Sequence, residues 1–144
     1  MNELPYTMER TILIQADRKT VFSFFTDSRL WAAWWGAGST IDARAGGELT
    51  IHQSNGFIST GNVLELEAPD RFVFTFSLQT NPPTPAEASR VTIRLHDEAE
   101  GTRVALRHEL ANEAVCQLME QGWRFHLSLF ANAVANEVHS SLAD

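Results

Sequence analysis

A single long helical segment at the C-terminal end of the chain follows an almost unbroken run of strand segments. In residues 113–142, apolar side chains recur every three or four positions, and Leu118 and Leu129 widen this stripe. In residues 40–112, apolar and polar side chains alternate instead. A sheet with one apolar face needs a cover, and only the terminal helix is long enough to provide it. The sequence therefore predicts an α+β fold in which an antiparallel sheet packs on the C-terminal helix.

Turn signals divide the strand region into separate strands. Asn55-Gly56 lies between residues 48–53 and 57–68, and this dipeptide is a strong hairpin signal. The three prolines of residues 80–88 predict a loop, because proline cannot donate a hydrogen bond within a central strand. Further strands are predicted at residues 6–15, 72–78, 90–96 and 103–110.

Two short helices are predicted between the first strand and the rest of the sheet. Asp17 can cap the first helix, and Asp27 or Ser28 begins the second, which Gly36 and Gly38 end. The second helix carries three of the four tryptophans of the chain, namely Trp31, Trp34 and Trp35. These indoles either plug one end of the sheet or line a ligand cavity. We expect a plug for the group, with Trp35 as the exception at the mouth of a cavity.

Charge and composition limit the classes of partner. The chain has 18 acidic and 11 basic residues and a net charge of −7, and it contains no basic run. Its surface would repel a phosphate backbone, so we expect neither nucleic acid nor an anionic membrane as partner. The N-terminus lacks the pattern of a signal peptide, and no apolar stretch reaches the roughly 18 residues of a membrane span. We expect one cytoplasmic domain over residues 1–144, as a monomer or homodimer.

The histidines, the cysteine and the glycine-rich segment of the sequence do not indicate a metal or cofactor site. The five histidines show no ligand spacing, and Cys116 is the only cysteine and lacks a base near it in sequence. Gly46-Gly47 precedes a strand rather than a helix, so it predicts a tight turn and not a phosphate-binding loop. We therefore predict no metal, no cofactor and no catalytic residue.

Five segments occur in the order typical of one protein family. They read DRKTVFSFFTDSRLWAAWW, ARAGGEL, GNVLELEAPDRFVFTF, VTIRLHDEAEGTRVALRHEL and QGWRFHLSLFANAV. Together they resemble proteins similar to the C-terminal domain of the activator of the Hsp90 chaperone ATPase, a family of the START-like, pollen-allergen-like superfamily. The resemblance covers residues 6–138. It implies a helix-grip fold, with a curved antiparallel sheet of six or seven strands around the long helix and two short helices closing one end.

The resemblance also implies a cavity between sheet and helix, which in many superfamily members holds an apolar molecule. We expect a pocket of roughly 300–1,000 Å³ here. His108 takes an inward strand position and His126 an inward helix position, so the two either face each other across the cavity or serve as hydrogen-bonded core residues. The predicted ligand-binding residues are Trp35, Phe74, Phe76, Ile93, Leu95, Leu106, His108, Trp123, His126 and Phe130.

These observations favour a protein that binds a small apolar or amphipathic molecule in the cavity. One alternative is an enzyme of the polyketide cyclase or dehydratase type, which would use a cavity histidine as general acid or base. Another is a chaperone-interaction module that works through its outer surface. Because the sequence shows no acid–base pair and no nucleophile, we rank binding first and catalysis second.

Overall fold

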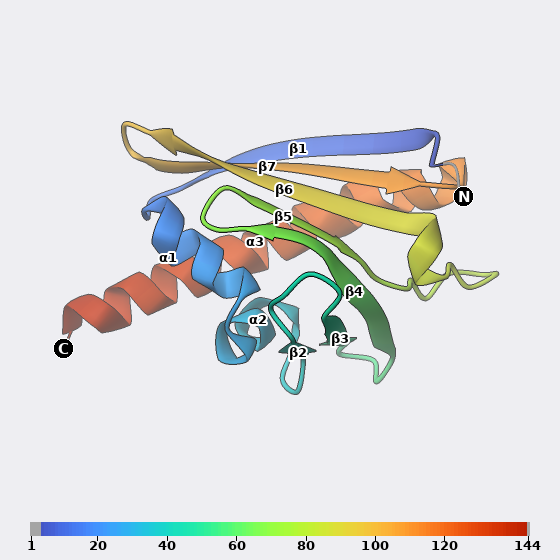
Figure 1. Ribbon diagram of the computed structural model, residues 1–144, viewed down its shortest axis with the longest axis horizontal. Helices are drawn as coiled ribbons and strands as arrows, with labels where there is room; N and C mark the ends of the chain where they lie inside the picture. Colours follow the sequence, from blue (N-terminus) through green and yellow to red (C-terminus); the bar gives the residue numbers. More distant parts are fainter. Residues whose placement is uncertain (1–3, 144) are drawn as a thin grey trace.

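One curved antiparallel sheet and one long helix dominate the computed structural model, which describes residues 4–143, with side chains to residue 140 (Figure 1). Within these residues the sheet has seven strands in the order β1-β7-β6-β5-β4-β3-β2. The strands are β1 (Tyr6–Ile14), β2 (Thr40–Ile41), β3 (Glu48–His52), β4 (Ile58–Glu67), β5 (Arg71–Thr75), β6 (Ser89–Glu98) and β7 (Gly101–Leu110). Every neighbouring pair is antiparallel, as the alternating pattern and the short turns require.

Helix α3 (Glu113–Ala143) runs along one face of the sheet (Figure 1). Its buried side chains include Trp123, Leu127, Phe130 and Val134, which recur at helical spacing. The inward side chains of the strands, such as Ile93, are buried beneath it. The α+β helix-grip fold predicted from the sequence is therefore confirmed.

The two predicted short helices follow β1. They are α1 (Arg18–Phe22), which continues into the 3-10 helix η1 (Ser23–Phe25), and α2 (Ser28–Trp35). Asp17 caps α1 by accepting from the Thr20 amide, and Asp27 caps α2 in the same way from Arg29 and Leu30. Gly36 ends α2 with φ of 136°, where a Cβ would lie 2.2 Å from the His52 carbonyl oxygen.

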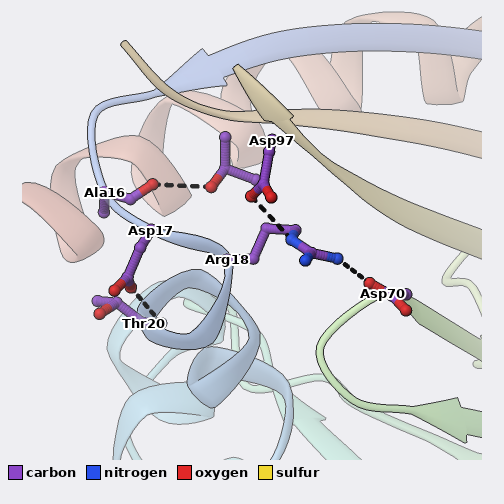
Figure 2. A network of polar contacts seen from close by, with 7 residues as sticks. Ala16, Asp17, Arg18, Thr20, Asp70 and Asp97 are labelled. Carbon is purple, nitrogen blue, oxygen red and sulfur yellow. Dashed lines mark hydrogen bonds and ion pairs between the residues drawn. The ribbon is translucent and has the colours of Figure 1, made fainter. Parts of the chain in front are cut away.

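Polar contacts fasten the start of α1 to two turns of the sheet (Figure 2). The Arg18 guanidinium binds Asp70 in the β4–β5 turn, and its Nε lies 2.8 Å from Asp97 near the β6–β7 turn. The Thr102 hydroxyl donates to the Ala16 carbonyl at 2.7 Å. These contacts hold the short helices over one end of the sheet.

The tryptophans of α2 pack into that end as an aromatic plug, made with Phe25 and Phe130. Trp31 and Trp34 are fully buried, and their indole N–H groups donate to the Thr50 and Phe24 carbonyls at 3.1 and 3.3 Å. Phe25 stacks on Phe130 with ring centroids 5.6 Å apart, and Trp34 meets the edge of Phe130 at 4.9 Å. This part of the interior is solid and apolar.

Two details of the sequence prediction are wrong. Leu118 was assigned to the buried stripe of the long helix, but it is 60% exposed, because the helix turns this position away from the sheet. The predicted strand over residues 72–78 ends at Thr75. Beyond it the chain continues irregularly yet stays buried, and Leu78 forms an isolated bridge with Thr84 next to the short 3-10 helix η2 (Ala86–Ala88).

Candidate ligand-binding site

A pocket of about 230 Å³ opens between the C-terminal end of α2, the β3–β4 hairpin, the segment after β5 and the first half of α3. Its volume lies below the predicted range, because aromatic side chains occupy much of the space between sheet and helix. The lining residues are Trp35, Gln53, Asn55, Ser59, Phe76, Leu78, Gln79, Thr80, Met119, Gly122, Trp123 and His126.

Three aromatic side chains from three different segments form the inner wall of the pocket. The ring centroids of Trp35 and Phe76 are 5.6 Å apart, and Trp35 meets the edge of Trp123 at 5.6 Å. Phe76 and Trp123 are edge-to-face at 6.4 Å. Such contacts fix the rings relative to one another, so the apolar wall is formed before any ligand arrives.

The rim of the pocket is polar and uncharged. Asn55 of the β3–β4 hairpin donates to the side-chain oxygen of Gln79 at 2.8 Å, which joins the hairpin to the segment after β5. Thr80 and Thr84 share a hydrogen bond of 2.6 Å between their hydroxyls. None of the lining residues is an arginine, lysine, aspartate or glutamate.

Two lining residues carry buried polar atoms that have no hydrogen-bond partner among residues 4–140. They are the indole Nε1 of Trp35 and the hydroxyl of Ser59, in side chains that are 6% and 1% exposed. Leaving such a group unpaired costs about 1–3 kcal/mol. Both residues belong to the pocket lining, so a ligand with a polar group can offset this cost.

His126 contributes a hydrogen-bond acceptor to the same pocket. Its Nδ1 lies 3.2 Å from the Gly122 carbonyl oxygen. Because a carbonyl only accepts, Nδ1 carries the proton and Nε2 keeps a free lone pair. Burial lowers the pKa of His126, while the bond to Gly122 opposes the shift. The ring also packs on Trp35, with centroids 4.7 Å apart.

His108 lies outside the pocket, so of its two open interpretations the hydrogen-bonded core residue is the one that fits the structure. Trp123 stands between the two rings, with centroid distances of 6.0 Å to His108 and 6.3 Å to His126. The Trp123 indole donates to His108 Nδ1 at 2.8 Å, so Nε2 carries the proton and donates to the Ser89 hydroxyl at 2.7 Å. Burial lowers the pKa of His108 to about 3. It is therefore a neutral core residue with both ring nitrogens bonded.

The fold and these side chains match a known family. A family model described as "Activator of Hsp90 ATPase homolog 1-like protein" matches residues 15–135. The chain belongs to this family. No curated protein matches it.

Solved structures of similar fold support the architecture of this family member. A crystal structure from Mesorhizobium loti has a TM-score of 0.79 at 16% identity, covering 91% of this chain and 98% of that one. The solution structure of an Aha1 dimer from Colwellia psychrerythraea has a TM-score of 0.76 at 14% identity, with coverages of 90% and 96%. An AHSA1-like protein from Aeromonas hydrophila has a TM-score of 0.75 at 21% identity, with coverages of 92% and 94%.

In this family member, only part of the predicted site gathers at the pocket. Trp35, Phe76, Trp123 and His126 line it. The others are buried in solid packing, namely Phe74, Ile93, Leu95, Leu106, His108 and Phe130. Ser59 and the polar rim were missed in the sequence. The sequence does predict the Asn55-Gly56 hairpin and the proline-rich loop, which each carry part of that rim. It does not show that the folded sheet brings them together.

Other groups with catalytic potential are already engaged or inert. Burial raises the pKa of the Cys116 thiol, so it is not a thiolate near neutral pH. The Gly46 and Gly47 amides donate to the Val63 and Arg44 carbonyls, which confirms a tight turn instead of a phosphate cradle. No three His, Cys, Asp or Glu side chains of the described part of the chain gather as metal ligands. No helix within residues 4–143 is long and apolar enough to cross a membrane.

Proposed function

We propose that the pocket binds a small, neutral, amphipathic molecule. The observation that carries this proposal is the pair of buried, unpartnered polar atoms on Trp35 and Ser59, next to an apolar aromatic wall. Burial of the ligand against that wall supplies the affinity, and the polar atoms orient it. The volume of about 230 Å³ favours a compact ligand of one or two rings.

The donors and acceptors of the pocket define the ligand more closely. Trp35 Nε1 can only donate, so it requires an acceptor such as a carbonyl. His126 Nε2 can only accept while the ring is neutral, so it requires a hydroxyl or N–H group. A carboxylate is disfavoured, because no cationic side chain lines the pocket to offset its desolvation. A hydroxylated aromatic ketone has the matching pattern.

Fluorescence titration tests this proposal with a matched pair of compounds, 4-hydroxyacetophenone and 4-hydroxybenzoate. Two of the four tryptophans line the pocket, so the neutral ketone should change tryptophan emission in a saturable way. Ser59→Ala should weaken its binding about fivefold, the worth of one hydrogen bond. The control is Ser128→Ala, since Ser128 is exposed on α3 and bonds only the Phe125 carbonyl. Tighter binding of the carboxylate, or no saturable change with either compound, would contradict the proposal.

Catalysis in this pocket would rest on His126 alone. General acid–base chemistry of the cyclase or dehydratase type is best served by two titratable groups held near the substrate. His126 is the only titratable side chain in the lining. The geometry therefore favours binding over catalysis.

Docking to a chaperone is a second candidate function, and one observation favours it. Leu118 and Phe125 lie seven residues apart on α3, and each is 60% exposed. Large apolar side chains so exposed on one helix suggest a protein contact. Phe125→Ser should abolish co-purification with the Hsp90-type chaperone of the source cells, whereas Ser128→Ala should not. Equal recovery with both variants would remove this candidate.

A further inference from the structure

A second hollow of about 310 Å³ lies over strands β1, β5, β6 and β7. Thr92 and Arg94 line it on either side of Ile93, which points into the core. Because side chains alternate along a strand, the hollow lies on the outer face of the sheet, opposite α3. It is thus separated from the pocket described above by the sheet itself.

Four arginines line this hollow, namely Arg10, Arg71, Arg94 and Arg107. Arg10 pairs with the inward Leu106, whereas the other three lie on the outer face around a floor of small side chains. Across β5 and β6, Arg71 is directly opposite Arg94, and across β6 and β7, Arg107 is directly opposite Thr92. Ala105 is the partner of Arg94 on β7. Two like charges directly opposite each other destabilise a sheet. The facing arginines Arg71 and Arg94 therefore do not stabilise the pairing of β5 with β6.

The hydrogen-bonding capacity of these arginines is largely unused. Arg71 donates through Nη1 to Glu65 at 3.0 Å, but its Nε is buried and has no partner. Arg94 and Arg107 take part in none of the ion pairs of the described residues, although the charge of Arg107 helps to lower the pKa of Glu109. Arg90 on the same face differs, since Glu109 holds it with two bonds of 3.0 Å.

Acidic residues border the hollow without cancelling its charge. Glu109 lines it and is hydrogen-bonded to Arg90, while the charge of Arg107 also lowers its pKa. Glu9 stands opposite Arg107 on β1. These carboxylates would repel an extended acidic polymer while leaving a compact anion access to the arginines. The lining holds four arginines and two glutamates, whereas the chain as a whole carries a net charge of −7.

We propose that this hollow binds a phosphate monoester or a free phosphate ion. Arg71, Arg94 and Arg107 line it from three strands and keep donors that are not hydrogen-bonded, and planar guanidinium groups match phosphate oxygens in charge and geometry. A bound dianion also removes the repulsion between Arg71 and Arg94. The site is independent of the proposed ligand pocket, because different residues on the opposite face form it.

NMR titration with inorganic phosphate, at an ionic strength held constant with chloride, tests the proposal. Amides of β5, β6 and β7 should shift in a saturable way. Arg94→Gln and Arg107→Gln should each weaken binding about tenfold or more. Arg124→Gln is the matched control, since Arg124 is an exposed arginine on α3. An equal loss in Arg124→Gln, or shifts that grow linearly without saturation, would overturn the site.

Melting temperatures measured with and without phosphate show whether the variants also affect folding. Without phosphate, Arg94→Gln should raise the melting temperature, because it removes one of two like charges that face each other. Phosphate should raise the melting temperature of the wild type but not that of Arg94→Gln. A lower melting temperature with an unchanged phosphate response would also overturn the site. Glycerol phosphate and vesicles containing phosphatidic acid then separate the sources: binding of the first alone indicates a free metabolite, and binding of the vesicles indicates a lipid headgroup.

Discussion

His108 has its ring enclosed on both sides, by the indole of Trp123 and the hydroxyl of Ser89. Protonation of Nδ1 would place two N–H groups against each other inside the core. This arrangement explains why burial lowers the pKa to about 3, and it makes the residue a structural one. The sequence showed an inward histidine, but not which of its two open interpretations would hold, because the deciding partner lies on α3.

The neutral state of His108 should make stability depend on pH. Its folded pKa of about 3 lies below the ordinary histidine value of 6.5 that an unfolded chain would show. As the pH falls from 6.5 to about 3, the unfolded state binds a proton that the folded state does not, so stability is lost over this window. We expect a loss of about 2 kcal/mol from this group between pH 7 and pH 5. Urea unfolding at both pH values should show a smaller loss for His108→Gln; an identical loss would contradict the assignment.

Helix starts and the succession of strands along the chain could be predicted, because local signals determine them. Asp17 caps the first helix as expected, Asp27 rather than Ser28 caps the second, and the long helix begins at Glu113 as predicted. The pocket could not be predicted in the same detail. In the sequence, Ser59 cannot be distinguished from other strand serines. It becomes a pocket residue only because Trp35 and α3 line the same pocket in the folded chain.

The aromatic plug should contribute far more to stability than the ion pairs that fasten α1. Trp31 and Trp34 are fully buried, so replacing either by alanine removes a large packed ring and should cost about 3–5 kcal/mol. Arg18 is partly exposed and its partners Asp70 and Asp97 more so, so Arg18→Ala should cost at most about 1 kcal/mol. Equilibrium urea unfolding measures both. A larger loss for Arg18→Ala than for Trp34→Ala would reverse this view of how the short helices are held.

In the whole molecule, the packing between sheet and helix changes along the axis of α3. Near the middle of the helix, Phe130 packs closely against the aromatic plug. Nearer the start of the helix, Gly122 has no side chain to fill the space. The irregular segment after β5 borders the sheet here, so a pocket stays open. The same elements thus provide a closely packed section around Phe130, which should carry stability, and a more open section near the start of α3 that can take a ligand.

This division predicts how the melting temperature of the whole protein responds to added compounds. A pocket ligand at one hundred times its Kd stabilises the folded state by about 2.7 kcal/mol, which for a chain of this size raises the melting temperature by about 5–10 °C. A neutral hydroxylated ketone should give this rise, and Ser59→Ala should require more ligand for the same rise. Zinc and chelators should change the temperature by less than about 1 °C, since the described residues contain no cluster of metal ligands. Differential scanning fluorimetry measures all of these responses. A rise in melting temperature with zinc but not with the ketone would contradict the proposed ligand class, and it would also contradict the conclusion that the histidines are not metal ligands.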